Sequence, residues 1–193
     1  LEILHDQEQY GNRFDAVVDG RIGGLANRVV VGFDWYRTRL VHSNNSPYGG
    51  ASTVDPYDFA PGFFVSPVPT RPGRRAELET RALYAEDMLD IAPGWKLVAG
   101  LRRDAMDFDN ADLRSGVALG KKYAPVTGRL GAVWSPNAQV SLYGQFGTAT
   151  DPLSGALALP NGSVSFDLTR GRQLEFGAKG GVPAVKGEWT LAA

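Results

Sequence analysis

The chain has 193 residues, no cysteine and a formal net charge of −1. Without cysteine it can form neither a disulfide framework nor a thiolate or cysteine metal site. The balanced charge, with no basic run, argues against nucleic acid as a partner. No stretch of about 18 apolar residues is present, which excludes a transmembrane helix but leaves alternating strands possible.

The first pair of predicted strands begins near Gln7. On the outgoing half, apolar residues take every second position, at Phe14, Ala16 and Val18. Residues 23–27 (GGLAN) tolerate positive φ and predict a turn. The returning half alternates most regularly, with apolar residues at Val29, Val31, Phe33 and Trp35. This period of two predicts two antiparallel strands.

A long irregular segment follows, from about Ser43 to Arg75. Its many prolines and glycines exclude a regular element of any length. A run of this length inside a compact domain is typical of a functional or disordered loop. Its aromatic content distinguishes it from a plain linker.

The second pair lies in segment 81–104, with a tight turn at Pro93-Gly94. Its returning half alternates at Trp95, Leu97, Ala99 and Leu101. The outgoing half is ambiguous, since Leu78, Ala82, Ala85 and Leu89 also fit a helical stripe. Recurrence of the hairpin plan elsewhere in the chain favours a strand.

Two further pairs complete the pattern. The third starts near Tyr123, turns at Ser135-Pro136-Asn137, and alternates at Leu130, Ala132, Trp134, then Val140, Leu142, Gly144 and Phe146. A second irregular loop runs from about Thr148 to Asp167. The fourth pair alternates at Leu174, Phe176 and Ala178, turns near residues 182–186, and returns through Trp189 and Leu191.

Together these patterns predict about eight strands in four hairpins, with short turns alternating with longer loops. Strands of a dozen residues exceed the typical length of about five or six in soluble proteins. The sequence therefore predicts an all-β fold, an antiparallel up-and-down transmembrane β-barrel segment. Aromatic residues at strand ends suit interfacial girdles: Tyr10, Trp35, Tyr36, Trp95, Tyr123, Trp134 and Trp189.

Five short motifs in order carry a resemblance to a known family. They are HDQEQYGNRFD leading into RVVVGFDWYRT, then LYAEDML, WKLVAGLRRD, RLGAVWSPNAQVSLYGQF and RGRQLEFGAKGG. In this order, across nearly the whole chain, they resemble the barrel of TonB-dependent outer-membrane receptors, most closely the siderophore (ferric-chelate) branch. Arg103 departs from the pattern, since an aromatic residue is common there.

The resemblance implies a plugged barrel of about 22 strands, of which residues 1–193 would form a middle-to-late part of one barrel domain. The plug domain and the C-terminal strands would lie outside this sequence. It implies a Gram-negative outer-membrane location and import of a ferric siderophore, with no enzymatic activity and no other cofactor. The implied partners are outer-membrane lipid, the siderophore, and TonB, reached through the plug segment. Related receptors take cobalamin, haem or glycans, and nothing in these loops separates those substrates.

The long loop is the best candidate for ligand binding under this resemblance. Ferric siderophores are often aromatic and anionic, so stacking side chains and cationic donors would suit them. The candidate residues are Tyr48, Tyr57, Phe59, Phe63, Phe64, Arg71, Arg74 and Arg75. The charged residues of the polar face are expected to contact the plug rather than the ligand: Arg13, Asp15, Asp34, Arg102, Arg129, Glu175 and Lys179.

No catalytic or metal-binding constellation is expected. His5 and His42 have no partner at a recognisable spacing. The aspartates at positions 104, 107, 109 and 112 lack the glycine and terminal glutamate of a calcium loop.

Two alternatives differ in architecture. One is a complete eight-stranded barrel acting as an anchor or adhesin, in which the first and last strands would pair. The other is a soluble β-sandwich binding carbohydrate or protein, with its apolar faces packed together.

Overall fold

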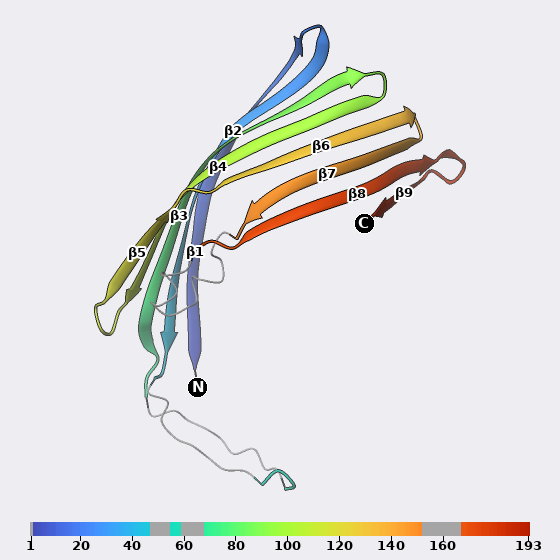
Figure 1. Ribbon diagram of the computed structural model, residues 1–193. Coiled ribbons are helices and arrows are strands. Elements are labelled where there is room, and N and C mark those ends of the chain that lie inside the picture. The colour runs from blue at the N-terminus through green and yellow to red at the C-terminus, as the bar shows by residue number, and fades with distance from the viewer. Residues whose placement is uncertain (1, 47–54, 59–67, 152–166) are drawn as a thin grey trace.

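The computed structural model describes residues 2–46, 55–58, 68–151 and 167–193 (Figure 1). Within them, no helix is long and apolar enough to cross a membrane. The strands are β1 (Ile3–Ile22), β2 (Leu25–Asn44), β3 (Arg71–Ala92), β4 (Trp95–Asp112), β5 (Ala118–Tyr123), β6 (Val126–Asn137), β7 (Val140–Thr150), β8 (Arg170–Val182) and β9 (Gly187–Ala192). A single 3-10 turn, Pro183–Val185, joins the last two. The ambiguous segment is therefore a strand, β3.

All neighbouring strands are antiparallel, in the order β1-β2-β3-β4-β6-β7-β8-β9. The remaining strand, β5, pairs with the second half of β4, whereas β6 pairs with the first half. Only Ala124 and Pro125 separate β5 from β6, so the two strands follow each other along the same side of β4. The sequence pattern did not predict this strand. Its hairpin turns at Gly116, which has a φ of 76°.

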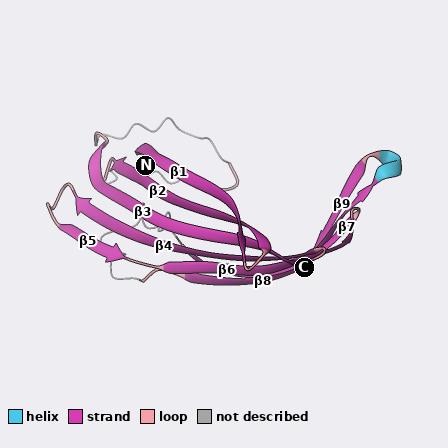
Figure 2. Cartoon of the chain, turned by 90° about the horizontal axis from the view of Figure 1, so that it is seen from above, coloured by secondary structure: helices cyan, strands magenta, loops and turns pink. Residues whose placement is uncertain are grey.

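The sheet forms one curved, open wall (Figure 2). In the described residues, β1 and β9 occupy opposite ends of the strand order and do not pair with each other. This arrangement argues against a closed eight-stranded barrel. A β-sandwich is also wrong, because all the described strands belong to one sheet and its apolar convex side is exposed.

Tight turns close the strand pairs at one end of the wall. Gly23 and Gly24 both have positive φ, 57° and 85°, and form a two-residue turn between Ile22 and Leu25. Gly94, with a φ of 75°, follows Pro93 as a type II turn requires. The third turn lies at residues 138–139, later than expected, because the Asn137 side chain accepts hydrogen bonds from the backbone N–H groups of Gln139 and Val140.

The convex face carries an apolar belt between two aromatic zones. Trp95 stacks on Trp134 near the tight turns, with ring centroids 5.6 Å apart, and Tyr10 meets Trp35 edge-on farther along the wall. The distance between the two aromatic zones follows from the strand register. Trp35 lies opposite Arg81, which lies opposite Ala105, and Ala105 is ten residues from Trp95 on β4. Ten residues at about 3.3 Å each, tilted by about 40°, span about 25 Å, the height of a barrel's apolar band. Exposed residues in the belt include Phe14, Val31, Phe33, Leu83, Leu97, Leu101, Leu130, Phe146 and Leu174.

The concave face is polar over most of the wall, and all seven charged residues assigned to the polar face lie on it. Towards the long-loop end this face becomes apolar and buried. There Leu40, Ala76, Leu78, Met106 and Phe108 form a cluster against which Tyr123 and Leu168 pack. Tyr36 and Tyr123 were wrongly assigned to the girdles, because the strand register places both on the concave side.

An aromatic ring lying over a glycine recurs on the wall. Gly32 on β2 lies opposite Tyr84 on β3, and the tyrosine ring fills the space that a Cβ at residue 32 would need. Tyr143 covers Gly177 in the same way. The missing side chain lets the ring lie flat across the neighbouring strand.

We expect Gly32→Ala to destabilise the barrel by about 1–3 kcal/mol, because the added methyl group displaces the Tyr84 ring. Equilibrium unfolding of the full-length receptor in lipid measures this change. Gly147→Ala is the matched control, since a Cβ there meets nothing within 4 Å. Equal costs for the two substitutions would show that the ring is not the cause.

Candidate functional site

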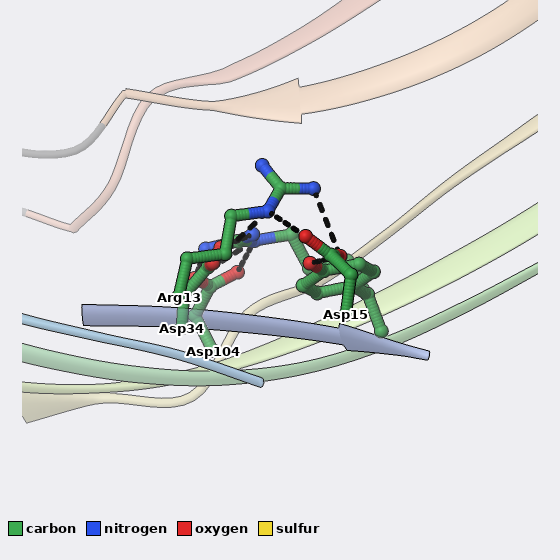
Figure 3. A network of polar contacts seen from close by, with 6 residues as sticks. Arg13, Asp15, Asp34 and Asp104 are labelled. Carbon is green, nitrogen blue, oxygen red and sulfur yellow. Dashed lines mark hydrogen bonds and ion pairs between the residues drawn. The ribbon is translucent and has the colours of Figure 1, made fainter. Parts of the chain in front are cut away.

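A network of charged side chains crosses the middle of the concave face (Figure 3). It joins four neighbouring strands, with Arg13 and Asp15 on β1, Asp34 on β2, Tyr84 on β3, and Arg102 and Asp104 on β4. Strand register places Arg13 opposite Asp34, and Tyr84 opposite Arg102. Alternation points these side chains to one side of the wall.

Two guanidinium groups connect the network. Arg13 Nε lies 2.9 Å from Asp15 Oδ2 and 3.7 Å from Asp34 Oδ1. Arg102 donates to Asp104 Oδ1 at 2.9 Å and pairs with Asp34. Both guanidinium carbons lie over the Tyr84 ring, at 5.0 and 5.8 Å from its centroid, while the Tyr84 hydroxyl donates to Asp15.

The network is mostly removed from solvent at its centre. The side chains of Asp34 and Asp104 are 14% and 6% exposed, and Arg102 bridges them. Buried carboxylates need such a cation, because an isolated charge there would be costly. Every carboxylate of the network is engaged by a guanidinium, and Asp15 also by the Tyr84 hydroxyl, which favours a structural role in the wall.

Further polar pairs extend the network towards β8. Arg129 Nε donates to Glu86 Oε2 at 2.5 Å, and the Tyr143 hydroxyl donates to Glu175 at 2.9 Å. The wall encloses a concavity of about 590 Å³ lined by Arg13, Tyr84, Arg102, Arg129 and their neighbours. Arg13, Asp15, Asp34, Arg102 and Arg129 thus take part in ion pairs within the wall. Glu175 instead accepts from neutral side chains, and Lys179 lies 5.2 Å from the centroid of the Tyr143 ring. The expected contact of these residues with a plug stays a prediction.

The candidate ligand-binding residues fall into two groups. Tyr48, Phe59, Phe63 and Phe64 lie outside the described residues. Tyr57 is 98% exposed, with its backbone N–H donating to Asp55 Oδ1 at 2.8 Å.

The three arginines lie in a strand, not in a loop as expected. Arg71, Arg74 and Arg75 open β3, because pairing with β2 tolerates an irregularity at Pro72 and Gly73. Arg74 is half-buried opposite His42 on the concave side. Arg75 faces the convex side, 3.6 Å from Glu77. Their role in ligand binding remains a prediction.

Arg114 was not singled out from the sequence. It lies at the outer rim of the wall, which we define as the edge where β2, β3 and the β4–β5 turn meet. Its Nη2 donates to Asn44 Oδ1 at 2.8 Å, to the Asn44 carbonyl at 2.9 Å and to the Arg71 carbonyl at 3.2 Å. The Asp112 side chain shapes the turn by accepting from the N–H groups of Arg114 and Ser115. The Asp-x-x-Ser-Gly pattern of residues 112–116 is the local signal for this turn.

The two histidines, which have no partner at a recognisable sequence spacing, lie beside each other in the fold. His5 and His42 lie opposite each other on β1 and β2, and His5 Nε2 is 2.8 Å from His42 Nδ1. Asn44 Nδ2 lies 3.1 Å from His42 Nε2. Burial first, then the charges of Arg74, His5 and Arg114, lower the pKa of His42.

No metal centre is found in the described part of the chain, where no three His, Asp or Glu side chains converge. The aspartate run cannot converge either. Asp104 faces the concave side, whereas Asp107 and Asp109 face the convex side.

We expect Arg102→Met to lower the free energy of unfolding of the full-length barrel by about 3 kcal/mol, because Asp34 and Asp104 lose their shared cation. Arg81→Met on the convex face is the control. Arg81 is 61% exposed and pairs with Glu79, so its loss should cost less than about 1 kcal/mol. Denaturant titration compares the two, and equal costs would contradict a buried network.

Comparison with known proteins identifies the family. Residues 2–193 match the family model described as TonB dependent receptor-like, beta-barrel. A search of curated proteins returned no match.

The fold also matches solved structures. The ferric-catecholate import receptor Fiu from E. coli K12, in its closed form, shares 17% identity at a TM-score of 0.76, over 97% of this chain and 31% of that one. BauA, the ferric preacinetobactin receptor from Acinetobacter baumannii, shares 15% identity at a TM-score of 0.74, over 98% of this chain and 28% of BauA. The unliganded ferric citrate transporter FecA shares 15% identity at a TM-score of 0.73, over 92% of this chain and 26% of FecA.

At these identities the matches show a shared fold, and the chain spans less than a third of each matched structure. The family model covers nearly the whole chain. Its members are outer-membrane transporters and receptors of Gram-negative bacteria and are not enzymes. The chain therefore belongs to the TonB-dependent receptor-like β-barrel family.

Proposed function

We propose that this chain supplies wall and outer rim of a receptor that imports ferric siderophores across the outer membrane of a Gram-negative bacterium. Residues 1–193 would form part of a single barrel domain, with lipid on the convex face. TonB would act through a plug segment held in the lumen. The substrate class is suggested by the matched receptors, whose names specify a ferric catecholate, ferric preacinetobactin and ferric citrate.

The cationic outer rim is the observation that carries this proposal. Arg71, Arg74 and Arg114 gather where β2, β3 and the β4–β5 turn meet. Guanidinium groups bind carboxylates and other anionic oxygens through paired N–H donors. An anionic iron chelate fits such a rim.

The convex side of the wall also carries pairs of arginine and glutamate side chains. On the convex face, Arg81 lies level with Trp35 and pairs with Glu79, and Arg37 farther along pairs with Glu77. Each of these arginines is neutralised by a carboxylate on a neighbouring or the same strand. Arg71 and Arg74 lie on the concave side, with Arg114 beside them, and we place the ligand there.

We expect Arg74→Gln in the full-length receptor to weaken binding of a ferric catecholate chelate about tenfold, the loss of about one charge-assisted hydrogen bond. Arg39→Gln is the control, since Arg39 lies at the same end of the wall but faces outwards near Glu8 and Glu77. Ligand titration measures both dissociation constants. The proposal fails if the unmodified receptor does not bind the chelate, or if the two variants behave alike.

A further inference from the structure

We infer that Arg114 is a positioning residue for ligand binding. It stabilises a β-bulge in β3, and the shape of this bulge determines the direction of the Arg71 and Arg74 side chains. This inference rests on the proposed function, because it concerns the same cationic rim. Arg114 itself need not touch the ligand. Its role is to hold the backbone that presents the two other arginines.

The bulge lies where β2 and β3 begin to separate. His42 pairs with Arg74 and Ser43 pairs with Pro72, so Gly73 is an extra residue on β3. A bulge bends its strand and changes the direction of the side chains beside it. Arg71 and Arg74 flank this bulge, which makes their orientation sensitive to its shape.

The Arg114 guanidinium fills the space beside the bulge. A Cβ at Gly73 would lie 3.5 Å from Arg114 Cζ, so the planar group lies against the glycine backbone. It donates to the Arg71 carbonyl at 3.2 Å and to the Ser46 carbonyl at 3.4 Å. The neighbouring Leu113 N–H donates to the Gly73 carbonyl at 3.0 Å. The turn after β4 thus holds both β2 and β3 at the bulge.

A second set of contacts holds the same strand ends from the side of β1. The Glu2 N–H donates to Asn45 Oδ1 at 2.8 Å, and the Thr70 hydroxyl donates to the Glu2 carboxylate. Asn45 is only 1% exposed. The ends of β2 and β3 are therefore fixed between Glu2 and Arg114, and removing Arg114 leaves one side of this support.

Arg114 also orients His42 through Asn44. Because Asn44 Oδ1 accepts from Arg114 Nη2 and from the Ser46 N–H, its NH₂ group faces His42 Nε2. His42 Nε2 must then accept, so its Nδ1 carries the proton donated to His5 Nε2. Protonation of His42 at Nε2 would oppose the Asn44 donor. The groups facing His42 are His5 from β1, Arg74 from β3 and Arg114 from the turn.

The contacts from Arg114 through Asn44 to His42 make the titration midpoint of His42 a measure of the Arg114 position. A general loss of stability would not change this midpoint. In the full-length receptor, Arg114→Lys keeps the positive charge but lacks the planar fork that reaches several acceptors. Asn44 is then free to rotate, so we expect the NMR titration midpoint of His42 to rise. His42→Gln assigns the resonance, and Arg39→Gln should leave the midpoint unchanged.

The binding arm uses the same ferric catecholate chelate. We expect Arg114→Lys to weaken its binding about tenfold, with the same thermal unfolding midpoint as the unmodified receptor. Asn44→Ala, which keeps the carbonyl contacts of Arg114, should weaken binding by less and still raise the His42 midpoint. This variant tests the inference if Arg114→Lys does not fold.

The outcomes are distinguishable. If the unmodified receptor does not bind the chelate, the proposed function fails, and the positioning role fails with it. If that receptor binds the chelate but Arg114→Lys binds equally well, only the positioning role is wrong. An unchanged His42 midpoint in both variants would also overturn it.

Discussion

A backbone N–H or C=O group in the hydrocarbon layer has no water to bind, so each membrane-spanning strand must be paired on both sides. β2, β3 and β4 satisfy this requirement, since each is paired on both sides along 18 to 22 residues. Pairing in turn forces side chains to alternate between the two faces. The separation of an apolar convex face from a polar concave face follows from this single constraint.

The polar concave face creates a second requirement, which the Arg13–Arg102 network meets. Charges removed from water must be paired, and each carboxylate of this network lies beside a guanidinium: Asp15 and Asp104 pair with an arginine on their own strand, and Asp34 pairs with Arg13 on the neighbouring strand and with Arg102 across β3. Beyond the Tyr10–Trp35 zone the ladders continue with ion pairs on the convex face and a buried apolar cluster on the concave face. The wall thus extends past the apolar belt and supports the rim at Arg114.

Local patterns predicted what local sequence determines. The alternation from Val29 to Trp35 and the Pro93-Gly94 turn were confirmed, because period and turn chemistry depend on adjacent residues. The helical stripe in β3 could not be resolved locally, since its state depends on pairing with β2 and β4. Arg114 and the His5–His42 pair were missed because their partners lie about 40 or more residues away in sequence. The plug contacts and the ligand-binding residues remain predictions.

Accessibility of single cysteines in the Val29–Trp35 segment tests the central claim most directly, and the chain contains no cysteine of its own. Spin labels placed singly at positions 29, 30, 31 and 33 of the full-length receptor in lipid bilayers would be relaxed by oxygen or by a water-soluble nickel chelate. The account predicts that labels at 29, 31 and 33 respond to oxygen and that the label at 30 responds to the chelate. A uniform response along the strand, or the opposite alternation, would contradict it.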